Sequence, residues 1–151
     1  MYTIIVIALL FVLPLVSTLV ELALTTGDVV SVAGKWLVFW AIGVRLVMAG
    51  VRQVSKPAFT AQTIFRLTDE AAFPIVREVG FGNLSMGALG LLSLAVPTWT
   101  VPAALVGGLY YLLAGLGHVA NAHRNAHEQT AMITDIIVAI LLLAFVAAKT
   151  V

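Results

Sequence analysis

The sequence lacks cysteine and is poor in charged residues. Only 10% of its 151 residues are charged, whereas 62% are apolar. A soluble domain of this length carries charge on about a quarter of its residues, so the composition excludes an ordinary water-exposed globule. The absence of cysteine excludes disulfides, thiolate metal ligands and a thiol nucleophile. The formal net charge of +1 gives no electrostatic reason to expect nucleic acid. The sequence therefore indicates an integral membrane protein whose first partner is the lipid bilayer.

Long uncharged stretches predict five membrane-spanning helices. A bilayer core of roughly 30 Å needs about 20 apolar residues per helix. The longest stretch without Asp, Glu, Lys or Arg, residues 79–123, exceeds that length and is interrupted by Pro97 and Pro102. We expect a single all-α transmembrane domain, with an amphipathic segment in the headgroup region between its second and third spans. The expected spans are residues 3–24, 36–54, 79–96, 101–122 and 131–148.

The basic residues predict how the five spans are oriented. On the side of the N-terminus the helix ends and loops carry five bases, against two on the other side. The positive-inside rule then places the N-terminus in the cytoplasm of a bacterial cell, with the spans in its cytoplasmic (inner) membrane. Residues 1–24 could alternatively be a cleaved signal peptide, but they lack a basic n-region and a clear small-x-small cleavage site.

Two charged residues fall inside predicted spans, Arg45 and Asp135. A charge at mid-membrane costs about 2.5 to 3.5 kcal/mol, so these positions are informative. Arg45 and Arg52 are seven residues apart, and so are Glu128 and Asp135. With the second and fifth spans antiparallel and in contact through alanines, Arg45 would meet Asp135 inside the membrane, and Arg52 would form a surface ion pair with Glu128. Alternatively, Arg45 reaches the headgroups alone and Asp135 is protonated or caps a helix.

Heptad stripes of small residues in the third and fourth spans predict that these two helices pack together. That pairing would bring Asn83 and His118 to a similar depth, near Asp135. We therefore predict one polar pocket, which either holds an ion, a proton or a polar headgroup, or is a hydrogen-bond network that only fixes helix packing. The residues predicted to form it are Arg45, Glu78, Asn83, Tyr111, His118 and Asp135.

Residues with possible catalytic or metal chemistry are few. His123 and His127 have the i, i+4 spacing that lets two imidazoles reach one metal on a continuous helix, and His118 could be a third ligand. Solvated loop histidines explain the pattern more simply, so we predict no metal site and no cofactor, and keep a haem or divalent metal as a weaker alternative. Neither Ser85 nor Ser93 lies in a nucleophile elbow, so we predict no catalytic residue.

Four stretches together resemble an uncharacterised family of short bacterial polytopic membrane proteins. They lie at residues 35–53, 59–65, 77–84 and 124–135. The family is distantly similar in size and layout to DoxX-like four-helix proteins, and the resemblance covers roughly residues 30–150. It implies no settled activity and transfers no catalytic residue. The stretches include most of the predicted polar residues, namely Arg45, Arg52, Glu78, Asn83, Glu128 and Asp135.

These observations predict a membrane protein that is not an enzyme. The leading expectation is a scaffold or accessory subunit that packs through its Gly and Ala faces as a homo-oligomer or within a larger membrane complex. The alternative is a carrier or channel-like protein that passes a small ion or polar solute through the cytoplasm-facing pocket. A haem-binding or metal-binding redox protein is the weaker third reading.

Overall fold

The computed structural model describes residues 2–64, 67–120 and 125–151. This part of the chain is almost entirely helical and contains no strand. Four of its helical stretches are long and apolar enough to cross a membrane by length and composition. The all-α class is thereby confirmed, and four of the five expected spans correspond to helices that could cross a membrane. The four stretches are Thr3–Leu24, Val29–Ser55, Pro97–Ala120 and Ala126–Thr150.

The first two of these stretches each contain a wider, π-helical turn at their centre. The first consists of α1 (Tyr2–Ile7), η1 (Ala8–Val12) and α2 (Leu13–Leu24). Its widening has a local cause, because Pro14 has no N–H to bond the turn before it. The second consists of α3 (Val29–Leu37), η2 (Val38–Val44) and α4 (Arg45–Ser55). Single π-helical turns inside α-helices occur often at functional sites.

The third expected span, at residues 79–96, corresponds to α5 (Phe73–Leu92), which is not among the candidate spans of the described chain. The preceding connection contains η3 (Phe59–Ile64) and η4 (Glu70–Ala72), which Asp69 caps through its side chain. After α5, η5 (Pro97–Trp99) turns the chain into α6 (Thr100–Ala120), and α7 (Ala126–Thr150) is the last helix. The interruption expected at Pro97 is therefore present.

Ion pairs connect three helices at one end of the molecule. Glu21 of α2 lies 2.5 Å from the Lys35 Nζ and accepts a hydrogen bond from the Trp36 indole at 2.7 Å. Asp28 caps α3 by accepting from the Ser31 N–H at 2.9 Å, and it also pairs with Lys149 of α7 at 2.7 Å. This end of α7 is thus fixed to the turn between α2 and α3.

The Asp28–Lys149 pair predicts an acid-sensitive contribution to stability. Hydrogen bonds from Lys149 and Ser31 lower the pKa of the Asp28 carboxyl below its usual 3.8. A depressed folded-state pKa stabilises the fold above the unfolded-state pKa, and this stabilisation is lost as the pH falls. Asp28→Asn keeps a good helix cap but removes the charge. We expect this variant to melt below the wild type at neutral pH, and the difference to shrink as the pH falls below about 4. Lys149→Met should behave in the same way, and a difference that stays constant through this range would contradict the assignment.

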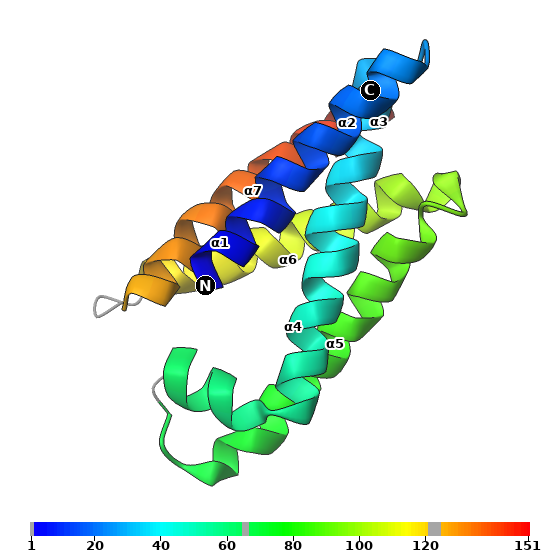
Figure 1. The fold of residues 1–151 in the computed structure, drawn as a ribbon. Helices are drawn as coiled ribbons and strands as arrows, with labels where there is room; N and C mark the ends of the chain where they lie inside the picture. Colours follow the sequence, from blue (N-terminus) through cyan, green and yellow to red (C-terminus); the bar gives the residue numbers. More distant parts are fainter. Residues whose placement is uncertain (1, 65–66, 121–124) are drawn as a thin grey trace.

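The helices pack as two groups, one that contains α6 and α7 and one that contains α4 and α5, and the groups separate toward one end (Figure 1). α6 packs along α7, and α4 packs along α5. The predicted pairing of the third and fourth spans is therefore wrong. Gly108 of α6 meets Leu143 of α7 instead, and Gly90 of α5 meets Gly43 of η2. A stripe of small residues permits close approach, but it does not specify which helix approaches.

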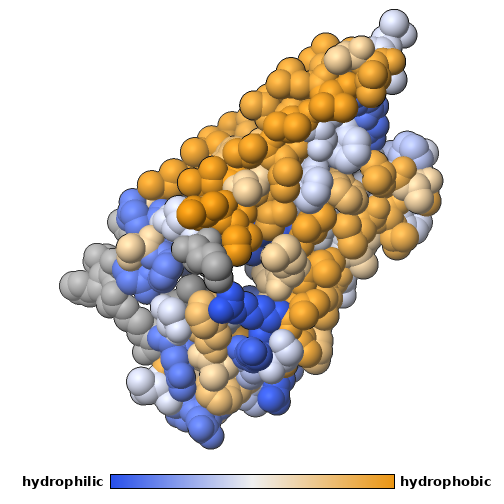
Figure 2. Space-filling model, viewed as in Figure 1, coloured by the Kyte–Doolittle hydropathy of each residue, from blue (hydrophilic) through white to orange (hydrophobic). Residues whose placement is uncertain are grey.

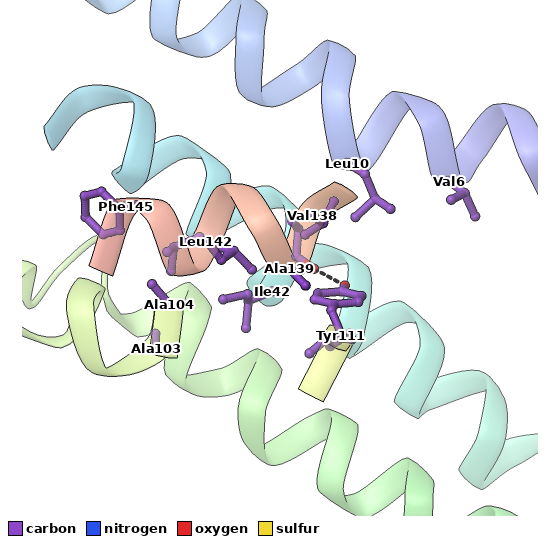
Figure 3. Close-up of a cluster of buried hydrophobic side chains, with 13 residues drawn as sticks. Val6, Leu10, Ile42, Ala103, Ala104, Tyr111, Val138, Ala139, Leu142 and Phe145 are labelled. Atoms are coloured by element: carbon purple, nitrogen blue, oxygen red, sulfur yellow. Dashed lines mark hydrogen bonds between the residues drawn. The ribbon is translucent and has the colours of Figure 1, made fainter. Parts of the chain in front are cut away.

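The two groups are joined by a buried apolar cluster at the level of η2. Leu10 of η1, Ile42 of η2 and Leu142 of α7 are each no more than 1% exposed. Figure 3 shows these side chains converging from separate helices. The cluster holds the helices together at this level, and the groups diverge only on one side of it.

Candidate binding cavity

A cavity of about 520 Å³ lies where the two groups of helices diverge. Its lining residues come from α1, η1, α4, η3, α5, α6 and α7. The expected alanine contact between the second and fifth spans is therefore wrong, because Ala49 of α4 and Ala131 of α7 both line this cavity. The glycine contacts hold α4 against α5, and α7 stays with α6. Arg45 and Asp135, which were predicted to meet across that contact, line the cavity instead.

One face of α4 supplies the positive wall. Arg45, Ala49 and Arg52 all line the cavity, as expected for residues at i, i+4 and i+7 of a helix. Arg45 lies ten residues from Ser55, the last residue of α4, or roughly 15 Å along the axis. Arg52 lies near the rim, with its guanidinium carbon 3.4 Å from the centre of the Phe59 ring. This cation–π contact fixes η3 beside the opening.

The negative group of the cavity is Asp135 on the opposite wall. It is 9% exposed and lies nine residues into α7, or roughly 14 Å from the start of that helix. The Arg45 charge acts on this carboxyl, but the two form no ion pair within 4 Å in the described part of the chain. The predicted pair thus shares one cavity at one depth without direct contact.

The predicted surface pair between Arg52 and Glu128 is not formed among the described residues, because each side chain has another position. Glu128 is 4% exposed and completes a capping box at the start of α7. Its N–H bonds to the Asn125 side chain at 2.9 Å, and its carboxylate accepts from the Asn125 N–H at 2.9 Å. The Asn-x-x-Glu pattern that signals such a box is present in the sequence at residues 125–128.

Asn83 of α5 forms part of the polar wall, as predicted, and is 2% exposed. Its amide donates to the Gln53 side chain at 2.7 Å, and its Oδ1 has no hydrogen-bond partner in the described part of the chain. Unpaired buried acceptors are rare, so this wall has unused hydrogen-bonding capacity. Glu78 was wrongly included in the pocket: it is exposed and does not line the cavity. Five residues of α-helix rotate it about 140° away from Asn83.

Tyr111, also predicted, closes the deep end of the cavity. Its hydroxyl donates to the Ala41 carbonyl in η2 at 2.5 Å (Figure 3). The π-helical turn makes this contact possible, because the Arg45 N–H bonds to Trp40 and Ile42 and bypasses Ala41. Among the described residues, no part of η2 or of α7 beyond Asp135 lines the cavity. The space therefore ends at the buried apolar cluster.

His118 lines the cavity as predicted, and His127 lies on its wall as well. His123 lies outside the described residues. Among the described residues, no group of three or more His, Cys, Asp or Glu side chains is placed to hold a metal ion. The absence of a cofactor stays a prediction. Sequence reasoning did not assign several further polar lining residues to the pocket, namely Arg52, Gln53, Thr60, Thr63, Tyr110 and His127.

The four apolar stretches and the charged cavity between them define a polytopic helical membrane protein. The chain belongs to a family of unknown function, DUF6790, whose model matches residues 1–150. Neither the curated proteins nor the solved structures include a significant match. The resemblance to an uncharacterised family is thereby confirmed, whereas the bacterial origin and the likeness to DoxX proteins stay predictions.

Proposed function

We propose that this protein binds a small anion in its membrane-embedded cavity and serves as a binding or carrier component. The observation that carries the proposal is the charge of the walls: two guanidinium groups, Arg45 and Arg52, face one carboxylate, Asp135. The lining residues that the structure describes therefore carry a net positive charge even when the histidines are neutral. Positive charge held away from water attracts and retains anions, and Arg binds carboxylates and phosphates through paired hydrogen bonds.

The cavity opens toward the cytoplasm in this proposal. The excess of basic residues near the helix ends on this side supports a cytoplasmic N-terminus and a cytoplasmic η3 end in the inner membrane of a bacterium. α5 is then the third of five spans, because it leads the chain from the η3 end back to the turn before α6 (Figure 1). The ion pairs of Glu21 and Asp28 lie at the outer surface.

The closed deep end favours a binding site over an open channel. A solute that entered beside Arg52 would stop at Tyr111 and the apolar cluster. Release on the other side would require the helices to separate there, as in a carrier. The scaffold or accessory-subunit role stays a prediction, and the cavity gives it no support, because a scaffold has no need of charges around a space.

Stabilisation by anions tests the proposal. The protein in an uncharged maltoside detergent would be melted with acetate, phosphate, dodecanoate or dodecyl phosphate, each against chloride at equal ionic strength. We expect at least one oxyanion to stabilise the wild type, by about 2.7 kcal/mol at one hundred times its Kd. Arg45→Gln should lose this response. Arg77→Gln should keep it, because Arg77 is exposed and lies outside the cavity.

A second variant keeps this test decisive if Arg45→Gln does not fold. The double variant Arg45→Gln/Asp135→Asn removes both deep charges and leaves neither without a counterion. It should fold and should not respond to any oxyanion. The proposal is wrong if no oxyanion stabilises the wild type, or if the double variant responds as the wild type does.

A further inference from the structure

The cavity has a side opening between α1 and α4. η1 packs against η2 and α1 packs against α7, but α1 makes little contact with α4. The two helices separate toward the N-terminal end of α1 (Figure 1), and the space-filling view shows a hollow there. Ile5 of α1 and Met48 of α4 line the cavity at this opening and are 38% and 48% exposed. Both helices belong to candidate membrane spans, so in a bilayer this opening would face lipid hydrocarbon.

The walls of the cavity are segregated by polarity. α1 and η1 contribute only apolar side chains, those of Ile5 and Val6 from α1 and of Leu9 from η1. Figure 2 shows hydrophobic surface on one side of the hollow and hydrophilic surface on the other. A purely hydrophilic solute would leave the α1 wall without a favourable contact. An apolar ligand would leave the arginines without one.

Building on the proposed function, we infer that the bound anion is an amphiphile of the membrane itself. Its oxyanion head, a carboxylate or a phosphate, lies between Arg45 and Arg52. Its hydrocarbon chain runs along α1 and leaves through the opening between Ile5 and Met48. The cavity volume of about 520 Å³ is within the usual range for small-molecule sites and accommodates a head with the first part of a chain.

Matched probes separate the contribution of the head from that of the chain. Acetate and inorganic phosphate supply the head alone, dodecanoate and dodecyl phosphate supply both parts, and dodecanol supplies the chain without the charge. Thermal stabilisation would be measured at a fixed ratio of each dodecyl probe to detergent. We expect the charged dodecyl probes to act at concentrations at least tenfold below those of the short anions, and dodecanol to have no effect.

A bulky side chain at the opening tests the path of the hydrocarbon chain. Met48→Trp should weaken the response to dodecanoate at least tenfold and leave the response to a short anion unchanged. Val51→Trp is the matched control, because Val51 is an exposed residue of α4 that does not line the cavity. The control should respond to every probe as the wild type does.

The possible results distinguish this inference from the proposed function. Equal responses to acetate and dodecanoate, or a response to dodecanoate that Met48→Trp leaves unchanged, would overturn the amphiphile and leave the anion site in place. A response to dodecanol as large as that to dodecanoate would contradict recognition of the head. No response to any probe would overturn both proposals together.

Discussion

Replacing Gly90 by alanine is expected to destabilise the protein by about 3 kcal/mol or more, because overpacking of this kind cannot be relieved by a rotamer change. A Cβ atom at this position would lie 2.5 Å from the Gly43 nitrogen and 2.9 Å from the Gly43 Cα. Both atoms belong to the backbone, so α5 and η2 must move apart to make room. Their separation would loosen the packing that holds α4 in place beside the cavity.

The same substitution at Gly82 is the matched control in the same helix. A Cβ at Gly82 meets nothing within 4 Å, so alanine there should raise stability by up to about 1 kcal/mol through its higher helix propensity. Thermal unfolding of both variants in one detergent gives the comparison. If Gly90→Ala melts at the wild-type temperature, the backbones of α5 and η2 are not in contact.

The losses of unfolding free energy caused by neutralising Arg45 and Asp135 separately are expected to add up to more than the loss caused by neutralising both in one protein. The two charges share one cavity at a similar depth, and each partly offsets the field of the other. Arg45→Gln leaves the Asp135 carboxylate without a counterion, and Asp135→Asn leaves the Arg45 guanidinium without one. We expect a coupling free energy of about 1 kcal/mol or more in a double-mutant cycle, read from unfolding in detergent.

A parallel cycle gives the baseline for this coupling. Asp69 caps η4 in the connection between α4 and α5 and does not line the cavity, so Arg45→Gln and Asp69→Asn should be additive. Additive losses for Arg45 and Asp135 as well would contradict their electrostatic coupling. The ladder of direct ion pairs expected from the sequence would predict a much larger coupling, because contact within 4 Å strengthens it.

Most of the predicted pocket could be found from the sequence, because residue types give the charges and residue positions give the spacing and the depth within each helix. Arg45 and Asp135 are conspicuous inside apolar stretches, and counting residues from the helix ends gives both a similar depth. Glu78 was assigned by depth alone, and its direction around α5 places it outside the cavity. Both coordinates of a helical residue, its height and its angle, are needed to assign it to a site.

The partners of the helices could not be predicted in the same way. Gly87 and Gly90 indicate a closely packed face of α5, and a tight hairpin made α6 the obvious mate. In the structure that face meets Val47 and Gly43. Which helix packs against α5 depends on complementary surfaces that are far apart in the chain, such as Gly90 against Gly43. The spacing of residues within one helix does not indicate which other helix it will contact. The cavity exists because α4 packs against α5 and α7 packs against α6. Since this pairing was not predicted, a direct alanine contact between α4 and α7 was expected where the cavity lies.

Native mass spectrometry of the protein, purified in maltoside detergent without added ligand, tests the occupancy of the cavity most directly. The wild type is predicted to retain an acidic amphiphile as a bound mass that is released on unfolding. Arg77→Gln should retain the same mass, and Arg45→Gln/Asp135→Asn should lose it. A wild type without any bound mass, or one equal mass on all three proteins, would contradict an acidic amphiphile bound at Arg45.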